Sequence, residues 1–565
     1  MSSFVKAIDH LSTAPLRQYG ENNHSEYAWS EQQKDKIVQL YYQINRCSEL
    51  ESKKLASIMH SLLNDSKNDV DMTDILLRLI VFTRDLIDGK GERRISFDFV
   101  YELAKIYPEQ AQKAIQYFVK DIPDKNNGTV HQYGSWRDLK LLWSDYDWKA
   151  IGVDSSFILK MWNEQLRDED HSKLSLAAKW VPREKSKYKR MFYALAEDYY
   201  EDYLLTPKTS DKLRMAKNKA YTNYRKMISK MNVLLDTVQI KQCGQSYSDI
   251  NYKHVTSITM EKQKNAFLNT DKNGKERSKK EDRIQGAVNL KKYISDKVER
   301  GETIQGKRVS IFDFVKDAMY YNVFSNADDV ESHRAIINSQ WEDAGKLLSN
   351  LDNYVAMVDT SGSMQDDNNI PHYNAIGLGC RIAEKSKLGR RVLTFNSQPS
   401  WVNLDNDKTL CDMVKTIDSS DSQGFGTNFT AALNLILDSV VKARLTNDVV
   451  KNIVLVILSD MQIEEQHNEK MSESMFSLIR DKYAEAGRLV HGIPYDMPNI
   501  MFWNLRTTKG FPVMTTQMGA SMMSGSNPAI INSFCSSGLS ELRTLTPWDN
   551  MLTLLNSDRY NIFSQ

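Results

Sequence analysis

The chain has 565 residues, enough for about three or four domains of ordinary size. Its 74 Lys and Arg residues balance its 73 Asp and Glu residues, so the net charge of +1 excludes a chain that is basic or acidic throughout. The 24 Gly and 12 Pro residues are few, which favours long helices over an all-β, collagen-like or low-complexity protein.

The cysteine pattern points to a reducing compartment. Five cysteines lie far apart without a CxxC pair, which disfavours a disulfide framework or a zinc site. The sequence shows no apolar signal-peptide core and no apolar run of the roughly 20 residues that would span a bilayer. We therefore expect an intracellular, cytoplasmic protein without membrane contact, or one in the host cytoplasm or virion if the source is viral.

Helical periodicity dominates the first 345 residues. Between Asp74 and Asp88, for example, Ile75, Leu79 and Ile80 recur at helical spacing. The same periodicity predicts helices over 33–63, 74–88, 96–118, 155–166, 191–204 and 309–321. No fixed repeat is evident, and helices with one apolar face bury it by stacking, so we predict an irregular HEAT-like array over 1–345. A charged stretch near 268–286 is expected to be a loop or a disordered insertion.

After residue 350, short apolar runs alternate with helical stretches. The runs predict strands at 354–358, 392–395, 453–458 and 500–503, with helices over 372–388, 428–444 and 470–486 between them. This alternation is typical of a doubly wound α/β fold with a parallel sheet, which we predict over 350–540. The last segment, 541–565, has an apolar side and is expected to pack back on the helical region.

Three motifs fall where these strands end or where a helix begins. Asp359-Thr360-Ser361-Gly362-Ser363 follows the first strand, Gly424-Phe425-Gly426-Thr427 precedes a helix, and Leu458-Ser459-Asp460 ends the third strand. Ligands of doubly wound folds bind at the carboxyl ends of strands, and carboxylate and hydroxyl oxygens suit Mg²⁺ or Mn²⁺. Helix capping by the Asp, Ser and Thr side chains is the alternative explanation for each motif.

The order of these motifs resembles that of a von Willebrand factor A domain with a metal-ion-dependent adhesion site. The resemblance covers roughly 350–540. It implies that one divalent cation, Mg²⁺ or Mn²⁺, is bound by Asp359, Ser361, Ser363, Thr427 and Asp460. It also implies an open coordination position that accepts an Asp or Glu carboxylate from a partner protein.

The helical region carries further recognisable phrases, Gly89-Lys90-Gly91-Glu92-Arg93-Arg94 and Tyr133-Gly134-Ser135-Trp136-Arg137-Asp138-Leu139. With them the chain resembles an uncharacterised family of plants, fungi and large DNA viruses, which joins a TROVE-like helical region to a von Willebrand A-like domain. The same domain order is distantly similar to the Ro autoantigen. That resemblance implies binding of small, structured or misfolded RNA.

A basic window is a second feature that bears on an RNA partner. Residues 179–230 contain 14 Lys or Arg and 6 Asp or Glu, so this window carries +8 in a chain of +1. Aromatic residues, including Trp180 and Tyr188, interleave with the basic ones, as single-stranded RNA binding requires. A solvated helix face with ordinary core aromatics is the alternative. The candidate RNA contacts are Lys179, Arg183, Lys185, Lys187, Lys189, Arg190, Lys217, Lys219, Arg225 and Lys226.

Catalytic motifs are missing from the sequence: there is no P-loop, no GxSxG elbow and no cysteine in a catalytic context. We therefore expect a non-enzymatic binding or scaffold protein, associated with RNA, whose cation site recruits a partner carboxylate. The alternative is a metal-dependent protein adhesion or assembly module without an RNA role.

Overall fold

The computed structural model describes residues 17–563 except 23, 123–130, 169–173, 272–273, 324–329, 347, 350, 421–425, 463–474 and 533–542. Contacts divide the chain into two compact units. The first comprises Met1–Ile58, Asp88–Glu92 and Lys297–Ser557, and the second comprises Met59–Ile87, Arg93–Asp296 and Asp558–Gln565. The first unit thus takes in 1–58 and 297–345, which we had expected in the helical array.

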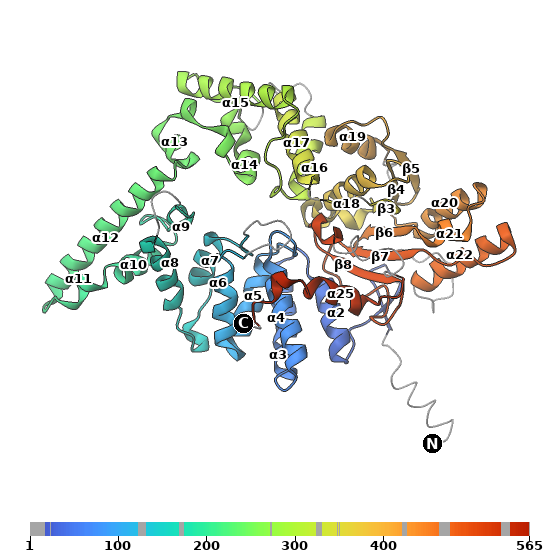
Figure 1. The fold of residues 1–565 in the computed structure, drawn as a ribbon, viewed down its shortest axis with the longest axis horizontal. Helices are drawn as coiled ribbons and strands as arrows, with labels where there is room; N and C mark the ends of the chain where they lie inside the picture. The colour runs from blue at the N-terminus through green and yellow to red at the C-terminus, as the bar shows by residue number, and fades with distance from the viewer. Residues whose placement is uncertain are drawn as a thin grey trace. The chain divides into compact units, whose positions relative to one another are not determined.

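A six-stranded mixed sheet forms the centre of the first unit (Figure 1). Its strands are β3 (Tyr354–Asp359), β4 (Arg391–Phe395), β5 (Ser400–Asn403), β6 (Val454–Ser459), β7 (Asn499–Asn504) and β8 (Ala520–Ser524). Their spatial order is β5-β4-β3-β6-β7-β8, and all neighbours are parallel except β4 and β5. From β3 the chain proceeds outward to β4 and β5, and it then returns to the other side of β3 to form β6, β7 and β8. The order of the strands therefore changes direction between β3 and β6.

The strand sequences explain why this sheet lies inside the unit. Every residue of β6, Val-Leu-Val-Ile-Leu-Ser, and of β7, Asn-Ile-Met-Phe-Trp-Asn, is buried. Continuous apolar runs of this kind are typical of parallel strands that are covered on both faces. The predicted α/β character of the C-terminal region and its four predicted strands are confirmed, but the sheet is mixed and not purely parallel, because β5 pairs antiparallel with β4.

Helices pack on this sheet from several parts of the sequence. α18 contacts β3, β4 and β6, while α20 contacts β4 and α22. α2 and α25 pack on β8, and α16 packs on α18 and α19. The helices of this unit are α2 (Gln33–Gln43), α16 (Ile311–Val323), α17 (Val330–Gly345), α18 (Asp366–Lys385), α19 (Leu410–Ser420), α20 (Phe429–Lys442), α21 (Asn447–Lys451), α22 (Met475–His491) and α25 (Pro547–Leu555).

The N-terminal residues belong to the first unit because α2 packs on β8. Seven of its eleven residues are buried, among them Tyr41 and Tyr42. The Tyr41 hydroxyl contacts the Met523 sulfur at 3.4 Å, and the Ser524 hydroxyl donates to the Tyr41 carbonyl at 3.0 Å. A short hairpin, β1 (Arg17–Tyr19) paired with β2 (Ser25–Tyr27), precedes this helix.

The second unit is helical in its described part, and the predicted helical character is confirmed. Two long predicted stretches are each broken in two: Pro108 starts a new helix within 96–118, and a turn divides 33–63. The helices of the second unit are α3 (Glu49–Asp65), α4 (Val70–Arg84), α5 (Arg94–Ile106), α6 (Pro108–Tyr117), α7 (Trp136–Asp145), α8 (Ser156–Asp168), α9 (Ala177–Trp180), α10 (Lys189–Tyr199), α11 (Glu201–Leu205), α12 (Ser210–Leu234), α13 (Val238–Gly244), α14 (Ser257–Phe267) and α15 (Glu281–Glu299). Of these, α3 and α15 extend into the first unit.

The two sequence motifs of the helical region, 89–94 and 133–139, have structural roles. Asp138 is fully buried and accepts from Arg84 Nη2 at 2.6 Å and from Arg93 Nε at 3.0 Å. It also caps α7, because the Ser135 backbone amide donates to its carboxylate at 2.8 Å. Lys90, in the first unit, is buried with its ammonium 4.0 Å from the Tyr41 ring centroid.

Two further expectations concern short segments. The stretch near 268–286 contains a bridge between Thr270 and Glu276, and it becomes helical at Glu281, so the described loop is shorter than predicted. Of the last segment, α25 packs on β8 within the first unit. Beyond it, Arg559 pairs with the buried Asp85 at 2.6 Å and Tyr560 packs edge-on against Phe82, both within the second unit. None of the described helices combines the length and the apolar character needed to cross a membrane.

Candidate functional site

The sheet reverses its winding between β3 and β6, and polar residues gather where these strands end. Asp359 is the last residue of β3, while Ser459 ends β6 and Asp460 follows it. Asp359, Ser459 and Asp460 are fully buried. In doubly wound sheets the crevice at such a reversal is where ligands bind.

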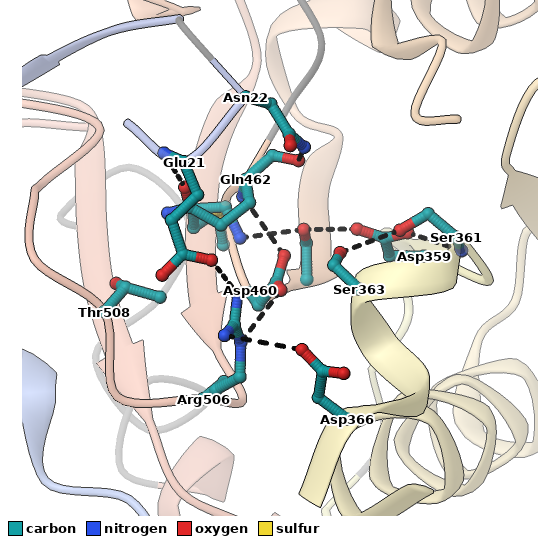
Figure 2. Close-up of polar contacts among 12 residues, drawn as sticks. Glu21, Asn22, Asp359, Ser361, Ser363, Asp366, Asp460, Gln462, Arg506 and Thr508 are labelled. Atoms are coloured by element: carbon teal, nitrogen blue, oxygen red, sulfur yellow. Dashed lines mark hydrogen bonds and ion pairs between the residues drawn. The ribbon is translucent and has the colours of Figure 1, made fainter. Parts of the chain in front are cut away.

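Asp359 is held by donors from the loop after β3, which Figure 2 shows, and from the last residue of β6. Its carboxylate accepts from the Ser361 amide at 2.9 Å and from the Ser459 hydroxyl at 2.5 Å. Burial and the nearby charge of Asp460 raise the pKa of Asp359, although these hydrogen bonds oppose the rise. Two carboxylates buried side by side disfavour each other's ionisation, so the site attracts positive charge.

Ser361 and Ser363 add hydroxyl oxygens to this pair. Their oxygens lie 3.3 Å apart, and the Ser363 hydroxyl also hydrogen-bonds to Asp460. Asp359, Ser361, Ser363 and Asp460 are therefore brought together, as their strand-end positions suggest. Their donor set consists of hard oxygen ligands, which fits Mg²⁺ or Mn²⁺.

Thr427 reaches the same edge of the sheet by a different route. The amide of the next residue, Asn428, donates to the Asn396 carbonyl at 3.0 Å, directly beyond the end of β4. The Asn396 side chain in turn donates to the Thr360 hydroxyl at 3.3 Å. Thr427 is buried there, while Gly424 and Phe425 of its motif lie outside the described residues.

Arg506 is the residue of this site that sequence reasoning missed. Its Nε and Nη2 atoms lie 3.1 and 2.9 Å from Asp460 Oδ2, and Nη2 also contacts Glu21 Oε2 at 2.7 Å. Nη1 lies 3.8 Å from Asp366 Oδ2. Burial raises the pKa of Asp460, and the Arg506 charge works against that rise. The available signal was its position two residues beyond Asn504, the end of β7.

A separate feature of the second unit concerns the predicted RNA contacts. Four cations surround two partly exposed rings, Trp180 and Tyr188. Distances to the Trp180 centroid are 5.8 Å from Arg137, 5.0 Å from Lys140 and 5.9 Å from Lys179. We call Arg137, Lys140, Lys179, Lys187, Trp180 and Tyr188 the basic–aromatic cluster.

Charge is concentrated in this cluster. Lys140 lies 5.2 Å and Lys187 4.6 Å from the Tyr188 centroid. Burial, followed by the charges of Arg137 and Lys187, lowers the pKa of Lys140. Within the described part of the chain, none of the four cations forms an ion pair with a carboxylate. Arg137 and Lys140 were not among the predicted contacts, because they come from α7, outside the basic window.

The remaining predicted RNA contacts divide into two sets. Lys217 pairs with Glu197 at 2.9 Å and Arg225 with Glu184 at 2.7 Å, and Lys219 lies over the Tyr203 ring. The others are exposed to solvent: Arg183, Lys185, Lys189, Arg190 and Lys226. Of the interleaved aromatics, Phe192 and Tyr224 are buried in the core, which matches the alternative explanation for those two.

Comparison with known proteins finds two segments of the chain similar to families without an assigned role. Residues 353–550 match the domain of unknown function DUF7788. Residues 154–350 match a second domain of unknown function, DUF2828. The uncharacterized protein L728 of Acanthamoeba polyphaga mimivirus is 26% identical over 521 residues, which cover 86% of this chain and 80% of that protein.

One solved structure is also similar over most of its length. The Ro (RSR) protein of Deinococcus radiodurans aligns with 89% of this chain and 99% of its own, at 11% identity and a TM-score of 0.34. The expected similarity to an uncharacterised family with a large DNA virus among its sources is thus supported by the viral relative and the two domain matches.

Proposed function

We propose that this protein is a non-enzymatic binding protein that associates with single-stranded RNA through the basic–aromatic cluster. The observation that carries the proposal is the arrangement of Arg137, Lys140, Lys179 and Lys187 around Trp180 and Tyr188. Cations neutralise phosphates, and partly exposed rings stack on unpaired bases. No described carboxylate lies within ion-pair distance of these cations, although the charge of Asp145 acts on Lys140 and Lys187, so the cluster keeps an excess of positive charge for an external anion.

The test is fluorescence anisotropy with a labelled oligouridine of about twelve nucleotides, a length within the usual range of single-strand sites. Reversing Lys140 and Lys187 to Glu is expected to weaken binding by about tenfold or more and to flatten its salt dependence. Reversing Lys67 and Lys160 to Glu, two exposed lysines elsewhere in the second unit, gives the same change in charge and is the matched control. Equal affinity of the double reversal and the control would contradict the proposal.

The sheet domain supplies the second part of the proposed function. It would resemble a von Willebrand factor A domain that holds Mg²⁺ or Mn²⁺ through Asp359, Ser361, Ser363, Thr427 and Asp460 and recruits a partner carboxylate. Two buried carboxylates with adjacent hydroxyls at the winding reversal support this assignment. When bound, the cation would supply a coordination position for an acidic side chain. Across the described residues, no group of three or more His, Cys, Asp or Glu is placed to hold a metal ion, so the assignment rests on the two carboxylates and the neighbouring hydroxyls.

Stabilisation by the cation tests this part directly. A ligand that binds only the folded state raises the free energy of unfolding by RT ln(1 + [L]/Kd), so millimolar Mg²⁺ should raise the Tm of the wild type. Asp359→Ala should lose that response. An equal Tm shift in both proteins would remove the cation site from the proposal.

Metal-dependent protein adhesion without RNA is the second candidate, favoured by the same pair of carboxylates. It predicts that a protein partner is lost on addition of EDTA or with Asp359→Ala. It also predicts that the same partner is indifferent to reversal of Lys187, Lys189 and Arg190. RNA association predicts sensitivity to those reversals.

A further inference from the structure

The N-terminal hairpin is fastened to the sheet domain next to the candidate site. Tyr27 and Phe511 exchange two backbone hydrogen bonds of 3.0 Å each, which form an antiparallel bridge. Trp29 packs edge-on against the Phe511 ring at 5.1 Å. Gly510 lies so close to Glu26 that a Cβ at that position would overlap the carboxylate. The hairpin is therefore fixed in position and not a free tail.

The turn of this hairpin reaches the loop that carries Asp460 (Figure 2). The Glu21 amide donates to Gln462 Oε1 and the Asn22 side chain donates to the Gln462 carbonyl, both at 2.7 Å. The Gln462 amide donates to Asp460 Oδ1 at 3.1 Å. One glutamine thus joins the hairpin turn to a candidate cation ligand.

Arg506 makes the second connection between the same groups. Its guanidinium faces three carboxylates, those of Asp460, Glu21 and Asp366. The Arg506 side chain is 14% exposed, so these contacts are only partly screened by water. The Arg506 guanidinium neutralises the Asp460 carboxylate, which a divalent cation would also need as a ligand.

We propose that Arg506 is a built-in competitor of the cation at Asp460, and that Glu21 of the hairpin sets the strength of this competition. The proposal rests on the proposed cation site. Glu21 draws the guanidinium away from Asp460, so the hairpin favours cation binding. Without Glu21, Arg506 pairs more fully with Asp460.

Two substitutions should therefore change cation affinity in opposite directions. Arg506→Gln removes the competitor and should tighten Mn²⁺ binding by about tenfold or more. Glu21→Gln should weaken Mn²⁺ binding by a few-fold. If Glu21 acts through Arg506, the double variant should bind as Arg506→Gln does, whereas two independent field effects would add.

The experiment is titration of the full chain with Mn²⁺, following the electron paramagnetic resonance signal of the free ion. Arg480→Gln is the matched control, because Arg480 is a 58% exposed arginine on α22 that pairs with Asp481. Asp359→Ala identifies the binding that belongs to the candidate site. Glu21 is half exposed, so Glu21→Gln is expected to fold normally. This variant therefore tests the proposal even if Arg506→Gln does not fold.

The outcomes separate the two levels of the proposal. Asp359-dependent binding that Arg506→Gln tightens and Glu21→Gln weakens supports the inference. Asp359-dependent binding that neither substitution changes, or that the double variant alters additively, overturns the inference and leaves the cation site. Mn²⁺ binding that is missing from every variant, or indifferent to Asp359→Ala, overturns the cation site and the inference together.

Discussion

Asp138 offers the sharpest test of how the second unit is stabilised. We consider Asp138→Asn, which keeps the shape of the side chain and removes its charge. Arg84 and Asp138 are both fully buried, and Asp138 also holds Arg93, whose side chain is 40% exposed. The substitution leaves the guanidinium of Arg84 buried without its counter-charge.

The magnitude follows from this burial. Removing one partner of a buried ion pair costs about 3–5 kcal/mol, because the other charge stays desolvated. Asp138 also caps α7 through the Ser135 amide, and weakening that cap adds up to about 1 kcal/mol. We expect the free energy of unfolding to fall by about 4 kcal/mol.

The assay is urea denaturation of the full chain, with hydrogen exchange of α4 and α7 as a local readout. Asp145→Asn is the control, since Asp145 is an exposed carboxylate on the same helix. Protection in α4 and α7 should fall only in Asp138→Asn. A loss below about 1 kcal/mol, or equal losses in both variants, would refute the reasoning from buried charge.

Three further predictions concern other parts of the chain. Burial lowers the pKa of Lys90 below its value in the unfolded chain, so the buried ammonium destabilises the folded state less as the pH rises toward that unfolded value. The free energy of unfolding should therefore rise less with pH in Lys90→Met than in the wild type. A Cβ at Gly306 would overlap the Gln340 carbonyl, so Gly306→Ala should lower the Tm. Gly244→Ala should lower it far less, because a Cβ there would meet only the Ser246 hydroxyl at 3.6 Å. Trp180→Ala should weaken oligouridine binding by about 1–3 kcal/mol in anisotropy titrations if one base stacks there.

The strand ends at the centre of the sheet could be read from the sequence because their signal is local. An apolar run followed by Asp359, and another followed by Ser459 and Asp460, mark where buried strands stop. β5 and β8 were missed for the opposite reason. Ser-Trp-Val-Asn is short, and Ala-Ser-Met-Met-Ser lacks β-branched residues, so neither segment stands out from a loop or a helix.

Long-range pairing could not be predicted. Arg506 contacts Glu21, which lies 485 residues away, and no local pattern links the two residues. The buried face of α2 was visible as periodicity, but a helix pattern does not say which surface the helix covers. Arg137 and Lys140 were passed over in the same way, since α7 carries no basic run and joins the cluster only through the fold.

The discontinuity of the first unit has a consequence for the order in which the protein folds during synthesis. The hairpin and α2 are made first, but β8, on which α2 packs, is among the last strands to be made. At about 5–20 residues per second, the roughly 240 residues between Ile58 and Lys297 alone delay their partners by about 12–48 s. During that interval the apolar face of α2 has no sheet to cover. The apolar face of α2 is therefore exposed on the nascent chain until β8 has been made.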